Sequence, residues 1–544
     1  MTTTHEVFNQ APPLVGHNTA ADPALREGVE REGAAWALPE IDELGRLAGT
    51  AEAQDWGRLA ERVPPRLHTH DRYGNRVDEV EYVPAYHQLM RTAVTHGLHG
   101  APWADDRPGA HVARAAKFYA WQVDAGHGCP ISMTYAVVPA LRANPELAAR
   151  FEPLLTNREY DPGLRDPESK RGLIAGMSMT EKQGGSDVRA NTTTAVPQAD
   201  GTWELRGHKW FTSAPMSDLF LTLAQTPAGV SCFLVPRVLP GGERNAMRFM
   251  RLKEKLGNRS NASSEIEYDA ATGWLVGEEG RGVRTIVEMV NMTRLDCVIG
   301  SSAGMRTAVT AAAHHARHRS AFGELLVDQP AMANVLADLH VESEAATSAM
   351  TRLAGANDRA IRGDEGEQSL RRIALAVTKY YVCKRAPMAV GEALECLGGN
   401  GYIEDFDLAR TYREMPLLSI WEGSGNVAAL DALRALAKEP HTLDAFLGEA
   451  DLALGADRRY DAAVDRLRKE LTSFDDVQLR ARRIVEQMAL VFQGSQLVRH
   501  APAAVADAFC ASRLDRDWGG ALGTLPPGLD LGPVLARTTT DFPG

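Results

Sequence analysis

Gly176-Met-Ser-Met-Thr-Glu-Lys-Gln-Gly-Gly-Ser-Asp-Val188 is the stretch that decides the fold of this 544-residue chain. Its first residues continue an apolar, strand-like run, and Gly184 and Gly185 then allow the backbone to turn tightly. Such a turn presents the hydroxyls of Thr180 and Ser186, with main-chain N–H groups, to the polar edge of a ligand. A turn without a ligand is the alternative, because the stretch does not match the G-x-G-x-x-G dinucleotide fingerprint and the chain contains no P-loop.

The sequence around this turn predicts an α+β chain. Runs rich in β-branched and aromatic residues, such as TWELRGHKWFTS, DLFLTLAQT, VSCFLVP and EIEYDAATGWLVG, predict strands, with Asp200-Gly201 as a hairpin turn. Apolar residues recur at helical spacing over residues 20–150 and again from Gly282 onward, where long helices are predicted. The block after Pro440 is helical in pattern to about residue 515 and then rich in Gly and Pro. The predicted domains are 1–171 (helical), 172–282 (β), 283–438 (helical bundle) and 439–544 (extra helical domain).

The composition argues against several classes of protein. The chain has 71 Asp+Glu against 59 Lys+Arg, a formal charge of −12, which opposes whole-surface attraction to nucleic acid but leaves a local basic patch open. The 6 cysteines are scattered without a C-x-x-C pair, as in a reducing compartment. The N-terminal MTTTHEVFNQAPPLVG has no signal-peptide pattern, and no apolar run reaches the roughly 18 residues of a membrane helix. We therefore expect a cytoplasmic protein with no membrane partner.

Other motifs carry polar groups, and each has a structural alternative. In GHKWFTS, Trp210 and Thr212 share a strand face by two-residue alternation, although an aromatic packed in a β core would give the same pattern. Arg319 and Gln329 lie near the end of one helix and the start of the next, which suits a phosphate or ordinary capping. In LGGNGY, Asn400 and Gly401 are suited to a left-handed turn that ends a helix.

His314, His315 and His318 form the one candidate metal motif. His314 and His318 share a helical face, but the carboxylate of the H-E-x-x-H pattern is missing. We therefore predict no metal site.

The stretch SIWEGSGN, residues 419–426, places Glu422 between a tryptophan and two glycines. By itself this pattern favours a loop acid that faces water. A base held over a reactive group is the alternative, and the order of the motifs bears on that choice.

Taken together and in order, these motifs resemble the acyl-CoA dehydrogenase superfamily. MTEKQGGSDV, NTTTA, GHKWF, LKEKLGNRSNAS, YREMP and SIWEGSGN are similar to its alkylation-response, AidB-like branch, and the similarity covers nearly the whole chain from Val7. The resemblance implies a helical N-terminal domain, a central β-barrel-like domain, a helical bundle with FAD bound between the domains, an extra C-terminal helical domain and a homotetramer.

The resemblance also implies which residues contact FAD. In the turn after the first strand and in the GHKWFTS strand, the implied contacts are Met179, Thr180, Gly185, Ser186, Trp210 and Thr212. Trp210 is expected beside the isoalloxazine ring, and Thr212 near its reactive edge. At the adenine–pyrophosphate end of FAD, usually the FAD of a neighbouring subunit, the implied contacts are Arg319, Phe322, Gln329, Gly399 and Asn400. Ser424 and Asn426 are implied as flavin-side contacts. The chain departs from the family at Ala321, where a threonine is usual, and the spacing to Gln329 is about one residue short.

The implied chemistry gives Glu422 a role. In this family a carboxylate removes the α-proton of an acyl-CoA thioester while the β-hydrogen leaves as hydride to flavin N5. Some members carry the base on an earlier helix, at the approximate place of Thr293, and threonine cannot serve as that base. The resemblance therefore implies that Glu422 is the base. The related nitroalkane-oxidising enzymes carry Asp at this position, so Glu422 favours acyl-CoA chemistry over nitroalkane oxidation.

The branch suggests a second function, binding of double-stranded DNA through the extra domain. From Pro440 onward we count 12 Lys+Arg and 15 Asp+Glu, so basic clusters stand among acids. Three sequence clusters are candidates: Arg458/Arg459, Arg466/Arg468/Lys469 and Arg480/Arg482/Arg483. The alternative hypotheses are therefore a DNA-binding stress-protection protein in which FAD is structural or acts on damaging agents, and a scaffold without a cofactor.

Overall fold

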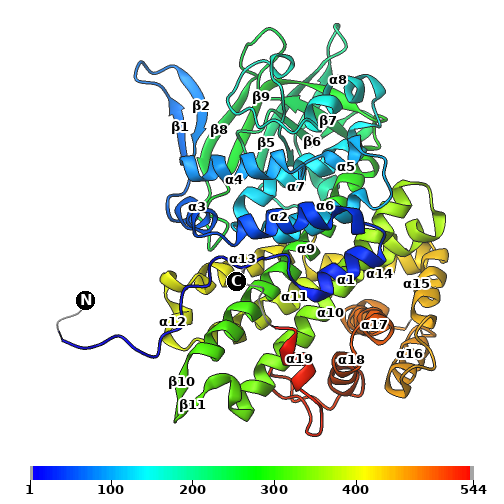
Figure 1. Cartoon of the computed structure of the whole chain (residues 1–544). Coiled ribbons are helices and arrows are strands. Elements are labelled where there is room, and N and C mark those ends of the chain that lie inside the picture. The colour runs from blue at the N-terminus through cyan, green and yellow to red at the C-terminus, as the bar shows by residue number, and fades with distance from the viewer. Residues whose placement is uncertain (1–3, 474, 539–544) are drawn as a thin grey trace. The chain divides into compact units, whose positions relative to one another are not determined.

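The computed structural model describes residues 4–473 and 475–538 (Figure 1). The first three residues of the N-terminal segment and the last six of the Gly/Pro-rich tail lie outside this range. The chain divides into two compact bodies. The sheet body comprises Glu52–Ala110 and Val123–Asp296, and the helical body comprises the chain to Ala51, His111–Gln122 and the chain from Cys297. The four-domain division at residues 171, 282 and 438 stays a prediction.

Strands of the sheet body close into a ring. The pairing order is β3-β6-β4-β5-β9-β7, β8 pairs with β9, and β6 also pairs with β7, so the path returns to β6. Buried side chains from these strands, including Phe220, Phe233 and Phe249, form an apolar core. This closure confirms the barrel-like domain. The strands are β3 (Ala175–Ser178), β4 (Thr194–Pro197), β5 (Trp203–Ser213), β6 (Leu219–Thr226), β7 (Gly229–Pro236), β8 (Met247–Leu252) and β9 (Ser263–Val276).

The predicted strands are present, and one hairpin was missed. Asp200-Gly201 connects β4 to β5, and Gly201 has a φ of +85°, as the predicted turn requires. Within the region expected to be helical, β1 (Arg66–His70) and β2 (Arg76–Glu81) form an antiparallel hairpin. Leu67 and Val80 of this hairpin pack against the apolar core. The helices of this body include α4 (Pro84–Thr95), α5 (Ala101–Ala104), α7 (Ala125–Leu141) and α8 (Pro145–Leu155), and α3 (Ala51–Arg62) begins at its boundary.

The helical body is built on the long helices expected from the periodicity. Helix α10 begins at Pro330, where proline needs no hydrogen-bond partner, and α11 ends at Cys396 just before Gly398. The principal helices are α9 (Gly282–His318, which begins in the sheet body), α10 (Pro330–Ile361), α11 (Glu365–Cys396), α13 (Leu408–Ile420) and α14 (Gly425–Lys438). The N-terminal part adds α1 (Pro23–Arg31), α2 (Leu38–Ala48) and α6 (Ala110–Ala120, which begins one residue before this body). The extra block is helical as predicted: α15 (His441–Asp451), α16 (Arg458–Glu470), α17 (Val477–His500), α18 (Ala503–Phe509) and α19 (Gly532–Ala536).

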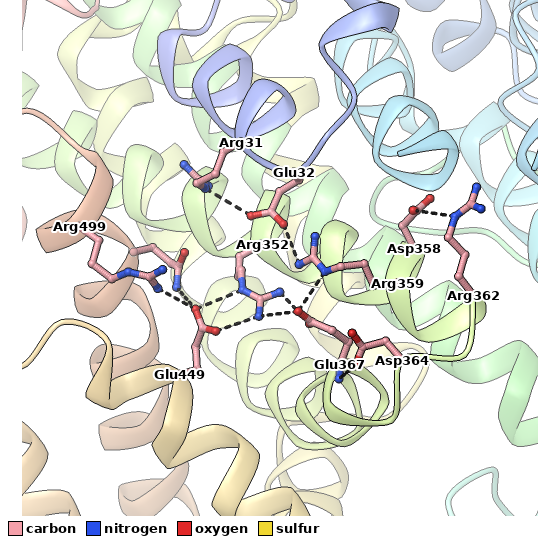
Figure 2. A network of polar contacts seen from close by, with 11 residues as sticks. Arg31, Glu32, Arg352, Asp358, Arg359, Arg362, Asp364, Glu367, Glu449 and Arg499 are labelled. Atoms are coloured by element: carbon pink, nitrogen blue, oxygen red, sulfur yellow. Dashed lines mark hydrogen bonds and ion pairs between the residues drawn. The ribbon is translucent and has the colours of Figure 1, made fainter. Parts of the chain in front are cut away.

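A buried ionic network joins the extra block to the bundle (Figure 2). Arg352 of α10 donates to both oxygens of Glu367 on α11 and to both oxygens of Glu449 on α15. Arg499 of α17 donates to Glu449 as well, at 3.0 Å. Removing one member of such a network would leave an uncompensated charge out of water, so these pairs fix how α15 and α17 pack on the bundle.

The structure bears on three expectations from composition. All 6 cysteines are buried, as predicted. Over residues 4–473 and 475–538, no helix is long and apolar enough to span a membrane. Within the same ranges, no group of three or more His, Cys, Asp or Glu side chains is arranged to hold a metal ion.

Candidate active site

The turn after β3 is held by its own backbone. Glu181 and Gly184 exchange main-chain hydrogen bonds of 3.2 and 3.1 Å, and Gly184 has a φ of +152°. At Gly185 a Cβ atom would lie 2.4 Å from the Thr180 hydroxyl, so only glycine fits beside Thr180 in this turn. The N–H of Trp210 donates to the carbonyl of Thr180 at 2.8 Å, which joins the turn to β5. The two motifs that predicted a flavin site are therefore in contact.

Glu181 is the buried support of this turn. Its carboxylate accepts from Lys209 of β5 at 2.8 Å, and both side chains are fully buried. The main-chain N–H groups of Thr192 and Thr193 donate to it as well. Burial opposes ionisation of this carboxyl, but the Lys209 ammonium and the hydrogen bonds outweigh it and hold its pKa well below the usual range. Lys209 was identified only as part of GHKWF and was given no role, although the alternation Leu205, Gly207, Lys209 along β5 is a signal that could have indicated its burial.

Trp210 is half-buried and lies among cations. The Lys253 ammonium is 3.0 Å from the centre of its ring, a cation–π contact, and Lys253 also pairs with Glu265 at 2.6 Å. Arg251 and Lys182 lie farther out, at 5.8 and 6.0 Å from the same ring. Lys253 belongs to LKEKLGNRSNAS and Lys182 to MTEKQGGSDV, motifs in which no lysine was singled out, and Arg251 directly precedes the first of them.

The expected shared face of Trp210 and Thr212 needs correction. A bulge interrupts the pairing of β5 with β9 between Lys209 and Thr212. Lys209 and Thr212 are both buried, with two less buried residues between them, so strict alternation does not hold across this step. The Thr212 hydroxyl lies 2.5 Å from that of Ser178 on β3.

In the helical body, Arg319, Phe322 and Gln329 lie on and beside one tight hairpin. Its strands are β10 (Ser320–Ala321) and β11 (Glu324–Leu325), and the two turn residues Phe322 and Gly323 have φ values of +56° and +92°. The Phe322 side chain is 101% exposed. Gln329 donates to the carbonyl of Ala321, and Arg319 donates to the carbonyl of Asn9 at 2.6 Å.

The LGGNGY turn differs from the prediction. The left-handed residue is Gly398, with a φ of +59°, rather than Asn400 or Gly401. Residues Gly399–Tyr402 instead form the short helix α12. Gly401 is needed for another reason, because a Cβ there would lie 2.0 Å from the carbonyl oxygen of Leu394.

Glu422 occupies a strained loop between α13 and α14. Its φ is +57°, a left-handed conformation that costs a non-glycine residue roughly 1–2 kcal/mol, and Gly423 follows with a φ of +104°. The side chain is half-buried. Ser424 occupies the N-cap position of α14, and the Asn426 side-chain oxygen accepts from Arg482 of α17 at 2.8 Å. At the earlier helix, Thr293 is buried and its hydroxyl bonds back to main-chain carbonyls of α9, as suits a structural residue.

The predicted site residues are thus divided between the two bodies. The sheet body brings Met179, Thr180, Gly185, Ser186, Trp210 and Thr212 to the turn and the neighbouring strand. The helical body carries Arg319, Phe322, Gln329, Gly399, Asn400, Glu422, Ser424 and Asn426.

Known families match the chain in the same order as its motifs. The adaptive response protein AidB N-terminal domain matches residues 9–162. The acyl-CoA dehydrogenase middle domain matches residues 176–271, and the acyl-CoA dehydrogenase C-terminal domain matches residues 280–437.

Similar proteins extend the match to the full length. The protein named "Putative acyl-CoA dehydrogenase AidB" of Escherichia coli K12 is 47% identical over 524 residues, which cover 95% of each chain. "Acyl-CoA dehydrogenase family member 11" of Caenorhabditis elegans is 30% identical over 538 residues, covering 91% of this chain and 86% of its own.

Solved structures agree with these matches. Caenorhabditis elegans ACDH-11 in complex with C11-CoA has a TM-score of 0.86 at 28% identity and covers 94% of both chains. An acyl-CoA dehydrogenase complexed with FAD from Bacillus anthracis has a TM-score of 0.62 at 18% identity, covers 96% of this chain and 84% of its own, and supports the fold alone. The near-full-length identity and the ordered domain matches show that the chain belongs to the acyl-CoA dehydrogenase family, in its AidB-like branch.

Proposed function

We propose that the protein is an FAD-dependent acyl-CoA dehydrogenase in which Glu422 removes the α-proton of a thioester. The observation that carries this proposal is the strained loop of Glu422, with its φ of +57° between Trp421 and Gly423. A non-glycine residue persists in such a conformation where the surrounding structure requires it, and such positions cluster at active sites. A similar protein holds C11-CoA, which supports an acyl-CoA as the substrate class.

The turn after β3 fits a flavin. A Cβ at Gly185 would fill the space beside the Thr180 hydroxyl, and the half-buried Trp210 offers an aromatic plane joined to that turn. We assign FAD binding to Met179, Thr180, Gly185, Ser186, Trp210 and Thr212 of the sheet body, and to Arg319, Phe322, Gln329, Gly399, Asn400, Ser424 and Asn426 of the helical body. When bound, FAD accepts the β-hydrogen of the substrate as hydride.

The protein's own contribution is proton transfer and orientation. The Glu422 carboxylate takes the α-proton, and its main-chain N–H is assigned as a donor to the thioester oxygen, where negative charge develops. Trp421, the C-cap residue of α13, gives the proton acceptor an apolar neighbour.

Replacing Glu422 with glutamine tests this function. The Glu422→Gln variant should bind FAD and retain its yellow colour, but acyl-CoA should no longer bleach the flavin, because an amide cannot accept the α-proton. Absorbance of the wild type and the variant is followed with a panel of acyl-CoA chain lengths, and Glu365→Gln, at the exposed start of α11, is the matched control. Bleaching of Glu422→Gln at the wild-type rate would show that another residue is the base.

We also infer a homotetramer in the cytoplasm. A fully exposed phenylalanine at the tip of a tight hairpin suits a subunit contact better than a solvent-facing loop, and Phe322 is such a residue. The family resemblance implies that this segment reaches the adenine–pyrophosphate end of a neighbouring subunit's flavin, which supports the inference.

DNA binding remains the alternative function, and each basic cluster already has partners within the chain. Arg459 pairs with Asp457 and Asp507, and Arg468 pairs with Asp451. Arg480 pairs with Glu470 and donates to main-chain carbonyls. These contacts use donors that phosphates would need, so we favour the enzyme over the DNA-binding protein.

A further inference from the structure

A buried lysine binds the main chain on both sides of Glu422. Lys379 of α11 is 1% exposed, and its ammonium donates to the carbonyl oxygens of Trp421 at 2.9 Å, of Gly423, and of Ser419 at 3.4 Å. Over the described residues its hydrogen bonds go to main-chain carbonyls, and it forms no ion pair. The lysine therefore binds the loop without neutralising a carboxylate.

The position of these carbonyls explains why a cation lies there. Ser419 lies in the last turn of α13, which ends at Ile420, and Trp421 is its C-cap residue, so these two carbonyls lie at the negative end of the helix dipole, while Gly423 follows in the loop. An ammonium group that binds them offsets its own loss of hydration and satisfies groups that would otherwise be buried unpaired.

The lysine also spans the strained residue. It bonds to the carbonyls of the residues on either side of Glu422, whose backbone is left-handed. These carbonyls belong to the peptide unit that precedes Glu422 and to the one that follows Gly423, so the two bonds restrain the two-residue segment between them, which a single cap at the helix end would not do. This restraint limits the directions that the Cα–Cβ bond of Glu422 can take.

We propose that Lys379 is a positioning residue that holds the backbone of Glu422 in the conformation required for proton removal, a role that rests on the proposed function of Glu422. It does not touch the reacting atoms in this role. Its charge serves the loop carbonyls.

Three variants test the proposal. Lys379→Met removes the ammonium and keeps an unbranched apolar stem, Lys379→Arg keeps a cation, and Lys117→Met is the matched control. Lys117 is another buried lysine of the helical body, and its partner is Glu40 on α2. For each protein, we measure FAD content, kcat and KM with the acyl-CoA that bleaches the wild type, and hydrogen exchange of the peptide covering residues 419–426.

Lys379→Met should retain FAD and lose roughly 100-fold in kcat with KM changed less than about threefold, because a displaced base affects the reaction more than binding. Exchange in the 419–426 peptide should rise at least roughly tenfold, as expected when the loop opens locally. Lys379→Arg should recover most of both losses. Lys117→Met should leave the exchange of this peptide unchanged.

The measurements separate the proposal from the function on which it rests. If no acyl-CoA bleaches the wild type, the proposed function fails, and the exchange of the 419–426 peptide still shows whether Lys379 fixes the loop. Unchanged loop exchange in Lys379→Met, or equal losses in Lys379→Arg and Lys379→Met, would overturn the positioning role. Failure of both Lys379 variants to yield folded protein would overturn it as well, since the lysine would then serve the whole fold.

Discussion

Two glutamates of this protein lie in glycine-containing loops, and a buried lysine supports each in a different way. Glu181, in the turn after β3, is fully buried and pairs directly with Lys209 at 2.8 Å. Glu422, in the loop after α13, is half-buried, and Lys379 binds the carbonyls around it. In the first region the lysine uses the carboxylate as a structural anchor. In the second it anchors the backbone on either side of the glutamate.

The difference shows how one pair of residue types serves two purposes. A carboxylate that accepts a lysine and several main-chain N–H groups is held ionised and cannot readily act as a base. A base needs access to substrate and freedom from a permanent counter-ion. Burial alone therefore does not identify the reactive glutamate, and what distinguishes the two is the atom to which the lysine donates.

The largest expected effect comes from breaking the Glu181–Lys209 pair. Lys209→Met leaves the Glu181 carboxylate buried without its cation, which should lower the free energy of unfolding by about 3–5 kcal/mol. Urea unfolding of the FAD-free protein, followed by circular dichroism, measures this loss. The double variant Glu181→Met/Lys209→Met should lose less than Lys209→Met, because it leaves no unpaired charge. A loss below about 1 kcal/mol in Lys209→Met would contradict the anchoring role.

Glu449 sharpens the comparison, because it is a buried carboxylate neutralised by arginines (Figure 2). Burial raises its pKa, but Arg352, Gln496 and Arg499 outweigh this and lower it to about 2. Since the folded pKa lies below the unfolded value of 4.5, the stabilisation is complete above about pH 4.5 and is lost as pH falls towards 2. Glu449→Gln should thus be about 2–3 kcal/mol less stable than the wild type at pH 7.

That stability difference should narrow as the pH of the urea titrations is lowered from 7 to 3. Glu365→Gln, at the exposed start of α11, is the control and should show only a small difference from the wild type. A difference for Glu449→Gln that stayed constant with pH would show that the Glu449 network does not titrate over this range.

Much of the fold could be predicted from the sequence because its signals are local. The long helices follow from apolar spacing with Pro330 and Gly398 at their ends, and the β4–β5 turn follows from Asp200-Gly201. The β1–β2 hairpin was missed because its alternation is short and lies between amphipathic helices. The closure of the sheet depends on pairing of β4 with β6 and of β7 with β9, which no local pattern specifies.

The site was predictable at the level of motifs but not of contacts. Glu422 and the turn glycines could be identified from their neighbours in sequence. Lys379 could not, because it is 43 residues before Glu422 on another helix and resembles any other lysine of an amphipathic helix. The bulge between Lys209 and Thr212 could not be predicted either. An extra residue in a strand changes which face of the sheet the following side chains lie on, and it leaves no mark in the composition.

The smallest expected effect concerns Arg480, Arg482 and Arg483, the exposed counterpart of the buried lysines. Arg480 donates to Glu470 and to the carbonyls of Ser473 and Asp475, and Arg482 donates to Asn426. Arg483 is 64% exposed and lies 3.8 Å from Glu470, so it is the member best placed to reach a phosphate. If only Arg483 contacts DNA, replacing all three with alanine should change the slope of log K against log salt by about 1 or less.

Measuring the affinity for duplex DNA at several salt concentrations, from low to moderate, gives this slope for the wild type and the triple variant. Arg468→Ala, on a neighbouring helix of the same block, is the control. A slope change approaching 3 would mean that all three side chains exchange their internal partners for phosphates. The DNA-binding function would then regain its support.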